Sequence, residues 1–592
     1  MANLTNPVSF QNGEVFFYYE KTYGGPNVCD IDVAPGTKTV TFCGEPGSQR
    51  FLWPHFSLQD VNKSFPDVEE LIIENNVSSI SISNFMFPNV KKVTSHSMNF
   101  KSAPYLICNN VLQNTFCKQP DEIIDLQGIQ VIESYAFEGC LSTHIQNTKD
   151  IHIVKDKAFS GSAFLLNGSE KDGSIMAGTL LIGASKKDIV LPAETTVIAY
   201  HALSDISKIT VNHHESLYLL AESQSKFDTL FINMKESIYN QAFLESIRSL
   251  NIKNVEVCDE AIDVKTIDGI LYSKNGKSLL YCPKLHEASV SVLDGVENIC
   301  DDAFYMAYNI QEVIFPASLK RVGRNAFSGC NNLLTVDFGT GVEILDENSF
   351  SYCRSLKQVD IPANVKMIQD SVFCGCCDLE KVTLHSGLQY IGCSAFNGCA
   401  IKEVTLPETV CSIGRNAFCM LSSFKAEKYL PHTLFAICND FENYTEKAET
   451  IVTDMEINGH MLYVPVFLPR QKQIIFDKIL SVGYSNEDIM YDFLSAISSA
   501  ISYKHAFALY LYKKEETKEL TSYLRKAGKK IAERFIQNNN ESELVGFLKY
   551  GLLTENALKT ILDEANAANM TSAASYILQQ LDEVATRKTF RL

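Results

Sequence analysis

Hydrophobic residues between positions 290 and 420 recur at a fixed interval and form three columns. The first column is phenylalanine, at successive spacings of 23, 23, 23, 23 and 22 residues: Phe304, Phe327, Phe350, Phe373, Phe396 and Phe418. The second column is Ile, Val or Leu: Ile299, Val322, Leu345, Ile368, Ile391 and Ile413. The third is valine: Val313, Val336, Val359, Val382 and Val404. Because the three columns keep step, the pattern predicts a stack of repeats instead of one globular core.

The unit at 354–376 shows what each turn is expected to do. Val359 and Ile361 alternate with polar Gln358 and Asp360, which predicts a half-buried strand. The proline that follows ends the strand, because it has no N–H for a further ladder bond. The chain then returns, and its buried positions are expected to be Val365, Ile368 and Phe373. Since one turn cannot cover its own apolar side, successive turns must stack into a continuous rod.

The recurring motifs F-x-G-C and I-P resemble those of the BspA-like type of leucine-rich repeat protein. This type is found widely in bacteria and in some protists. The resemblance is strongest over residues 290–420 and extends back to about 122, where Phe137 and Cys140 restate the motif. Residues 160–290 are less regular. The resemblance implies a curved, β-rich solenoid, and a period of about 23 residues is typical of leucine-rich repeats.

The expected fold class is α+β, a leucine-rich-repeat solenoid followed by an all-α C-terminal domain. Residues 1–120 are expected to form an N-terminal cap with degenerate repeats, and 121–438 the BspA-like repeats. A hairpin insertion is expected near 267–284, because Asn275-Gly276 separates two apolar segments. Residues 439–592 are expected to be helical.

Helix start signals in this last segment are Ser485, Thr554 and Thr571, each ahead of an apolar-periodic stretch. Short helices with tight turns predict an antiparallel array, loosely ankyrin-like. The first interpretation of this tail is that it caps the solenoid and packs against it. The alternative is a second interaction module.

Charge and composition narrow the choice of partners. The net charge is −18, which argues against nucleic acid and anionic membrane as partners. From Arg470 onward 17 basic residues accompany 15 acidic ones, so the preceding part carries about −20. No run of 18 apolar residues occurs, and no secretory signal is recognised at the start. The expected location is cytoplasmic, with reduced cysteines; the cell surface or secretion is the alternative.

The cysteines and other reactive residues do not form a recognisable active site. Five cysteines lie three residues after a repeat phenylalanine, which indicates a structural role: Cys140, Cys330, Cys353, Cys376 and Cys399. The C-x-x-C at Cys374–Cys377 has no second ligand pair, so no metal site is predicted.

Three further kinds of functional site were considered: a thioester ligase, a phosphate-binding loop and a histidine metal site. Each lacks a residue or a spacing that its chemistry requires. The segment from Phe441 onward holds no cysteine, which excludes a thioester ligase there. The NGKS segment at 275–278 has Leu271 where a phosphate loop needs glycine, and His213-His214 lack ligand spacing. No catalytic residue, metal or cofactor is therefore predicted, and an enzyme is disfavoured.

The candidate binding surface is the strand-lined face, because solenoids commonly bind along such concave faces. Its outward residues are Glu312, Thr335, Asp337, Gln358, Asp360, Lys381, Thr383, Glu403 and Thr405. A plain solvated surface remains the alternative for this face. It is also the alternative for a basic group on the predicted helical tail: Arg525, Lys526, Lys529, Lys530 and Arg534.

The function that these patterns favour is a non-enzymatic protein-interaction module that binds an unknown protein partner through the solenoid, the helical tail or both. The alternative is a structural or adhesion protein at the cell surface.

Overall fold

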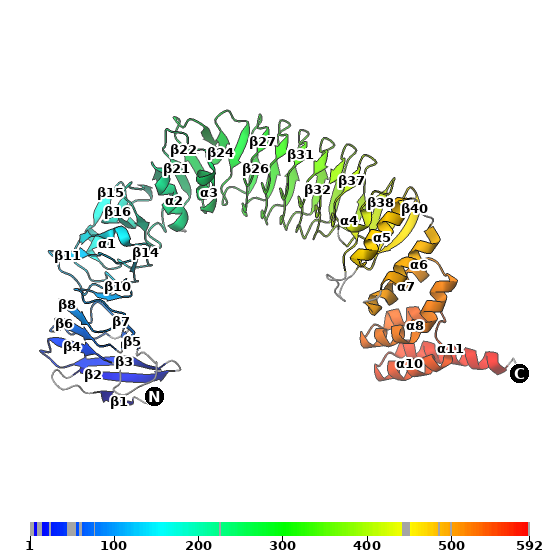
Figure 1. Ribbon diagram of the computed structural model, residues 1–592, viewed down its shortest axis with the longest axis horizontal. Coiled ribbons are helices and arrows are strands. Elements are labelled where there is room, and N and C mark those ends of the chain that lie inside the picture. Colours follow the sequence, from blue (N-terminus) through cyan, green and yellow to red (C-terminus); the bar gives the residue numbers. More distant parts are fainter. Residues whose placement is uncertain are drawn as a thin grey trace. The chain divides into compact units, whose positions relative to one another are not determined.

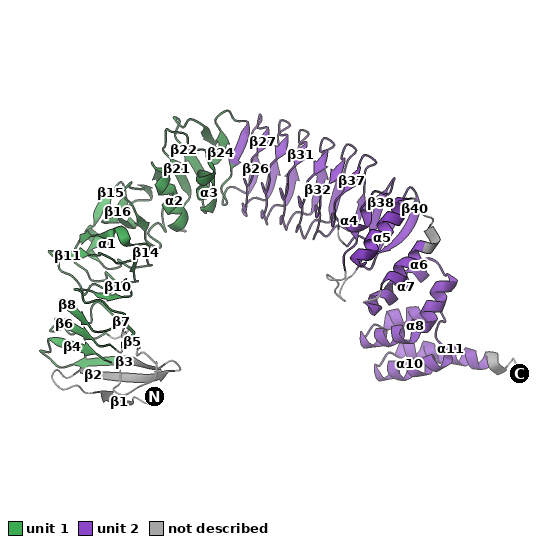
Figure 2. Cartoon of the chain, in the orientation of Figure 1, with its two compact units in different colours: residues 1–276, 281–286 green, residues 277–280, 287–592 purple. Residues whose placement is uncertain are grey.

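The computed structural model of the chain describes residues 5–8, 15–22, 25–43, 55–58, 62–75, 77–223, 226–418, 420–440, 450–482, 486–497 and 500–589. The chain forms two compact units (Figures 1 and 2). Unit 1 holds residues 1–276 and 281–286, and unit 2 holds 277–280 and 287–592. Ser485 and parts of the expected N-terminal cap lie outside the described residues.

Each repeat of unit 2 contributes two short parallel strands. One ladder joins β25 (Ser278–Tyr281), β27 (Asn298–Ile299), β29 (Arg321–Val322), β31 (Ile344–Leu345), β33 (Met367–Ile368), β35 (Tyr390–Ile391) and β37 (Ser412–Ile413). The strands of the other side are β26 (Ser289–Ser291), β28 (Glu312–Ile314), β30 (Thr335–Asp337), β32 (Gln358–Ile361), β34 (Lys381–Leu384), β36 (Glu403–Thr405) and β38 (Ser423–Ala426). The pattern predicted the second set and missed the first, because a two-residue strand shows no alternation.

The predicted apolar columns form the core of these turns. Every phenylalanine of the first column is at most 1% exposed, and the whole second column is buried. Neighbouring rings lie nearly parallel, with centroids 4.4 to 5.5 Å apart. The valine column is less uniform, because Val336 and Val382 are half-buried. Burial of each ring thus depends on the next turn along the chain.

The cysteine column has a specific bonding role. In unit 2 each of its thiols donates to the carbonyl oxygen of the phenylalanine 26 residues earlier, with Sγ···O distances of 3.1 to 3.2 Å in four pairs: Cys330–Phe304, Cys353–Phe327, Cys376–Phe350 and Cys399–Phe373. The same carbonyls accept a backbone N–H within their own turn. The Cys140 thiol of unit 1 instead donates to the Ser142 carbonyl at 3.7 Å. Burial raises the pKa of the Cys330 thiol to about 12, so this thiol stays protonated and keeps donating.

A left-handed backbone position recurs two residues before each repeat phenylalanine. The residues there have φ between 53° and 59° and are Asp302, Asn325, Asn348, Ser371, Ser394 and Asn416. Short polar side chains tolerate this conformation better than bulky ones. The glycine of F-x-G-C has a similar φ, and at Gly375 an added Cβ would lie 2.6 Å from the Tyr352 ring.

Unit 1 contains the same kind of turn in its N-terminal part. Parallel strands β4 (Thr39–Phe42), β6 (Glu70–Ile73) and β8 (Lys92–Ser95) form one ladder, and β5 (His55–Leu58) pairs with β7 (Ser79–Ile82). Antiparallel β1 (Thr5–Val8), β2 (Val15–Thr22) and β3 (Gly25–Val33) precede them, and β3 pairs with β5. The segment 68–82, expected to be a degenerate repeat, therefore supplies one strand to each of two parallel ladders.

The middle of unit 1 mixes repeats with antiparallel insertions. Its parallel strands include β10 (Val111–Asn114), β12 (Val131–Ile132) and β14 (Ile153–Val154), with β9 (Leu106–Cys108) antiparallel to β10; β11 (Ile123–Asp125) pairs with β13 (His144–Gln146). A three-stranded insertion follows helix α1 (Ala163–Asn167): β15 (Ser169–Lys171), β16 (Ser174–Ala177) and β17 (Leu180–Ala184), the last parallel to β19 (Val197–Ile198).

Residues 188–273 complete unit 1. Parallel strands β18 (Asp188–Val190), β20 (Lys208–Val211), β21 (Thr229–Ile232) and β22 (Asn254–Val257) carry helices α2 (His214–Ser223) and α3 (Gln241–Ser249) between them. Antiparallel β23 (Val264–Ile267) and β24 (Ile270–Ser273) turn at Asp268–Gly269, which both have positive φ. The strands β24 and β25 flank Asn275–Gly276, where the hairpin insertion is predicted.

Residues 439–592 are not all helical as expected, because a hairpin precedes the long helices of unit 2. Strand β39 (Val452–Ile457) pairs in parallel with β38 and in antiparallel with β40 (His460–Pro465). Its turn is Asn458–Gly459, with φ of 50° and 78°. Asn-Gly between two apolar segments is a strong hairpin signal, and it was available in the sequence.

The helices of unit 2 are α4 (Thr433–Ile437), α5 (Arg470–Ser481), α6 (Asn486–Ala496), α7 (Ile501–Lys514), α8 (Lys518–Gln537), α9 (Glu541–Leu548), α10 (Glu555–Ala567) and α11 (Thr571–Thr589). The predicted cap Thr554 accepts a hydrogen bond from the Ala557 N–H, and Thr571 is the first residue of α11. Helix α7 packs on α8, α8 on α9 and α10, and α10 on α11.

A buried carboxylate joins the last solenoid turn to the first long helix. Asp477 on α5 is 6% exposed and accepts three hydrogen bonds. The donors are the Tyr429 hydroxyl at 2.7 Å and the backbone N–H groups of His432 at 2.8 Å and Leu434 at 3.2 Å. These bonds satisfy donors at the start of α4 and fix α5 against it.

We expect Cys376→Ala to lower the free energy of unfolding by about 1–2 kcal/mol, because a buried sulfur and its bond to the Phe350 carbonyl are lost. Cys377→Ala is the matched control, since Cys377 is exposed, and its effect should stay within about 0.5 kcal/mol. Urea unfolding followed by circular dichroism measures both. Equal effects of the two substitutions would contradict a bonding role for the column.

We expect Asp477→Ala to destabilise the junction by about 2–4 kcal/mol, because three donors lose a charged acceptor in a buried place. Hydrogen exchange should show faster exchange of the α4 amides in this variant. Asp563→Ala, at an exposed position of α10, is the control. Unchanged protection of α4 would show that the carboxylate does not hold this junction.

Candidate functional site

The nine predicted face residues fall into two rows that follow the repeat. Glu312 pairs with Thr335 across β28 and β30, and Ile314 pairs with Asp337. Gln358 pairs with Lys381, and Asp360 with Thr383, across β32 and β34. Glu403 and Thr405 occupy the same two rows on β36. The expected neighbours are therefore adjacent within each strand pair.

All but one of these side chains are exposed; Thr383 is half-buried. Three of the carboxylates have hydrogen-bond partners. The Ser289 hydroxyl donates to Glu312 at 3.0 Å, the Gly339 N–H donates to Asp337 at 2.9 Å, and the His385 ring contacts Asp360 at 2.6 Å. The chemistry is mixed, with carboxylates, one ammonium group, hydroxyls and an amide. Such a surface can form hydrogen bonds and ion pairs with another polar surface.

The face continues beyond the residues that sequence reasoning selected. Ser423 and Lys425 on β38 pair with Glu403 and Thr405, and Asp454 and Glu456 on β39 follow in the same rows. The Lys425 ammonium group lies 2.9 Å from Glu456, and this bond raises the pKa of Lys425. These residues were missed because β39 comes after the last repeat phenylalanine.

Helix α7 contacts the end of this face. The Tyr510 hydroxyl donates to Asp454 at 2.5 Å, and the Lys514 ammonium group lies 3.3 Å from the same carboxylate. On the same helix, the Tyr503 hydroxyl donates to the Ile451 carbonyl at 2.6 Å. The helical part is thus bonded to the last strands of its own unit.

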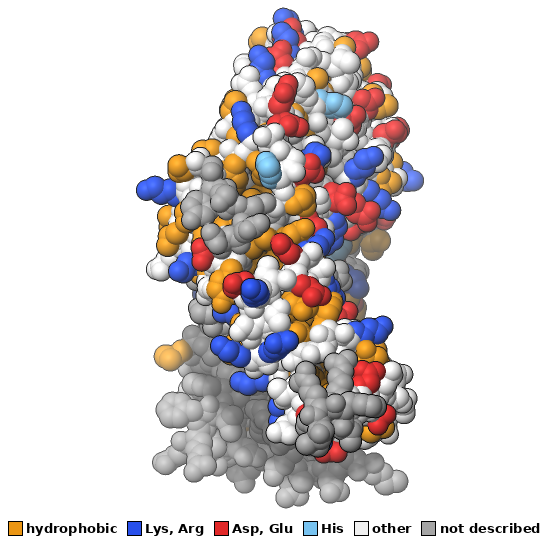
Figure 3. Space-filling model, turned by 90° about the vertical axis from the view of Figure 1, so that its right-hand side faces the viewer, with side chains coloured by type: hydrophobic (Ala, Val, Ile, Leu, Met, Phe, Trp, Pro, Cys, Tyr) orange, Lys and Arg blue, Asp and Glu red, His pale blue; other side chains and the backbone are white. Residues whose placement is uncertain are grey.

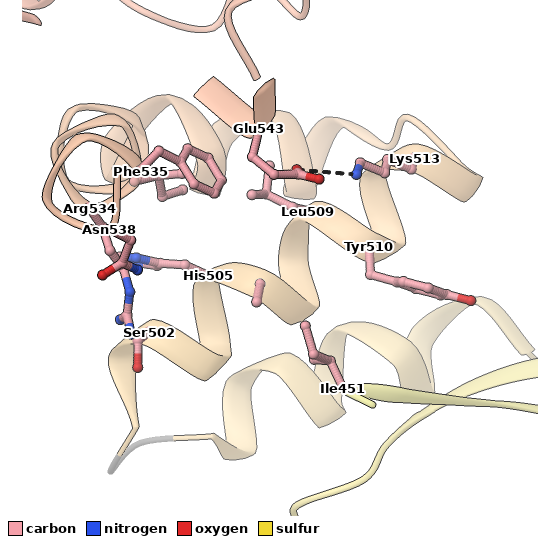
Figure 4. A pocket seen from close by; sticks show the side chains of 12 residues that line it. Ile451, Ser502, His505, Leu509, Tyr510, Lys513, Arg534, Phe535, Asn538 and Glu543 are labelled. Carbon is pink, nitrogen blue, oxygen red and sulfur yellow. Dashed lines mark ion pairs between the residues drawn. The ribbon is translucent and has the colours of Figure 1, made fainter. Parts of the chain in front are cut away.

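A cavity of about 300 Å³ lies among α7, α8 and α9 (Figure 4). Its apolar wall consists of Ile451, Ala506, Leu509, Ile531 and Phe535. Its polar lining consists of Ser502, His505, Tyr510, Lys513, Arg534, Asn538 and Glu543. The Lys513 ammonium group and the Glu543 carboxylate are 3.8 Å apart.

His505 is the unusual residue of this cavity. Its side chain is buried and lines the cavity, and its ring centroid lies 6.2 Å from that of the Tyr523 ring. Burial lowers its pKa, and the positive charges of Arg534, Lys530 and Lys504 lower it further. The imidazole is therefore neutral at pH 7, with cations on the same side.

The basic group predicted on the helical tail lies on α8. Arg525, Lys526, Lys529 and Lys530 are exposed, whereas Arg534 is half-buried and lines the cavity. Lys529 is paired with Glu533 at 3.6 Å. Figure 3 shows the face that lies on the right in Figure 1, where Lys and Arg side chains stand among hydrophobic ones.

The described ranges contain neither a metal-binding cluster nor a membrane-spanning helix. No group of three or more His, Cys, Asp or Glu side chains there could hold a metal ion. No helix in the same ranges is long and apolar enough to cross a membrane.

Comparison with known proteins identifies the repeats. A family model described as the BspA type leucine rich repeat region matches in six copies, over residues 62–166, 107–227 and 297–425. A comparison with curated proteins found no match.

Among solved structures, a leucine rich cell surface protein from Faecalibacterium prausnitzii is 18% identical, with 69% of this chain and 95% of that chain covered and a TM-score of 0.28. The pneumococcal vaccine antigen PcpA is 16% identical, with 70% and 94% covered and a TM-score of 0.28. The T. pallidum leucine rich repeat protein is 20% identical, with 29% and 87% covered and a TM-score of 0.23.

The family match covers both the regular repeats of unit 2 and the irregular ones of unit 1. On this match and on the 23-residue turns, the chain belongs to the BspA-type leucine-rich repeat proteins, and a helical region follows its repeats.

Proposed function

We propose that this protein is a non-enzymatic interaction module that binds a protein partner on the strand-lined face of its repeats. The observation that carries the proposal is the pair of exposed, in-register rows on β28, β30, β32, β34 and β36. Their side chains change from turn to turn, whereas the buried columns do not. A rigid row of variable polar groups at a fixed spacing supports selective recognition.

Protein is the class of partner that this surface favours. The solenoid part carries most of the negative charge, which opposes nucleic acid. The two rows hold both signs: Asp337 and Asp360 lie in one row, and Lys381 lies in the other. Complementary charges on a folded partner would set its register along the rows.

We expect the triple variant Asp337→Lys, Asp360→Lys, Lys381→Glu to lose at least about tenfold in affinity for the bound protein, because rim charges of reversed sign repel a matched surface. The partner is first captured from native lysate on the full chain and identified by mass spectrometry. Its purified form is then titrated against both chains. The full chain is needed because truncation after residue 438 removes β39, which pairs with β38.

The matched control reverses three exposed charges outside the rows: Glu343→Lys, Lys366→Glu and Glu408→Lys. Both triple variants change the net charge equally. Unchanged binding by the face variant, or equal losses in both variants, would place recognition elsewhere.

A second candidate is an adhesion or structural role at the cell surface, because BspA-type repeat proteins are often surface proteins. Protease treatment of intact cells separates the two settings. If the protein is a cytoplasmic interaction module, as expected, the protease should not digest it until the cells are lysed. Digestion of the protein on intact cells would favour the surface role.

A further inference from the structure

We propose that the cavity among α7, α8 and α9 binds a small organic carboxylate that has an apolar body. This site lies in the helical region and is independent of the partner proposed for the repeats. Its residues come from the helices α7, α8 and α9, from Asn538 just after α8, and from Ile451 just before β39. Nothing in the repeat pattern requires a cavity at this place.

The first argument is the state of His505. This imidazole is 8% exposed and lines the cavity. A neutral imidazole has one nitrogen that donates a hydrogen bond and one that accepts, so the ring can bond to a polar group in the cavity. A bound ligand oxygen would accept from the donor nitrogen of this ring.

The second argument is the sign of the surrounding charge. Arg534 lines the cavity, and the positive charges of Lys530 and Lys504 also act on His505. At the other end, Lys513 and Glu543 form their own pair. The field at His505 therefore favours an anion such as a carboxylate.

The third argument is the apolar wall. Ile451, Leu509, Ile531 and Phe535 would contact the body of the ligand. A volume of about 300 Å³ equals roughly ten water volumes at about 30 Å³ each, so a ligand of about ten non-hydrogen atoms fits. Octanoate has this size and chemistry. Inorganic phosphate has no apolar part and leaves the wall uncovered.

The test is calorimetric titration of the full chain with octanoate, with octan-1-ol and with inorganic phosphate. We expect octanoate to bind at least about tenfold more tightly than either of the others, because only octanoate offers both the anion and the apolar chain. Carbon and nitrogen NMR signals of the His505 ring should shift with octanoate. Equal binding of octan-1-ol, or no binding of octanoate up to its solubility, overturns the proposal.

Three variants place the ligand in the cavity. Arg534→Gln should weaken octanoate about tenfold and leave octan-1-ol unchanged, because it removes charge without changing the apolar wall. Leu509→Trp should abolish binding by filling the space. Arg525→Gln is the control, since Arg525 is exposed on the same helix and does not line the cavity.

Folding of each variant is checked by circular dichroism. If Arg534→Gln does not fold, Lys530→Gln takes its place, because Lys530 is exposed and acts on His505 through its charge alone. The expected loss is then about threefold at low ionic strength and disappears in high salt. Equal octanoate binding by Leu509→Trp and the unchanged chain shows binding outside the cavity and overturns the proposal.

Discussion

The constraint on which the repeats depend is that no turn can bury its own apolar side. Each phenylalanine ring is covered by the ring one turn further along, at 4.4 to 5.5 Å in the regular part. The cysteine of F-x-G-C adds a bond in the same direction, from its thiol to the preceding phenylalanine carbonyl. Stability is therefore shared between neighbours, and a lost turn exposes the one beside it.

The last turn of such a stack has no further turn to cover it, and in unit 2 other elements follow at this end. The hairpin β39–β40 pairs with β38 where the repeat phenylalanines stop. Asp477 then fixes α5 against α4, and Tyr510 fixes α7 against β39. The helical region is thus bonded to the final strands of its unit. This agrees with the interpretation that the tail caps the solenoid, and it makes residue 438 a poor place to divide the chain.

The sequence predicted most of the fold, because the buried residues recur in step. Phe350, Leu345 and Val359 lie in the core, as their columns indicated. The two-residue strands such as β33 were missed, since alternation cannot be seen over two positions. The predicted face residues are exposed and adjacent, but exposure alone does not identify a binding surface. The cavity was missed because it joins residues of three helices, and only the packing of α7 on α8 brings His505 and Arg534 together.

Helix α7 relates the two candidate sites of unit 2. Tyr510 and Lys514 bind Asp454, which stands in the exposed rows of the face. On the same helix, Leu509, directly before Tyr510, and His505, five residues before it, line the cavity. An α-helix is stiff along its axis, so a shift of α7 by a bound ligand would act on both sets of contacts. Because Tyr510 itself lines the cavity and also holds Asp454, it is the side chain through which such a shift would reach the face most directly.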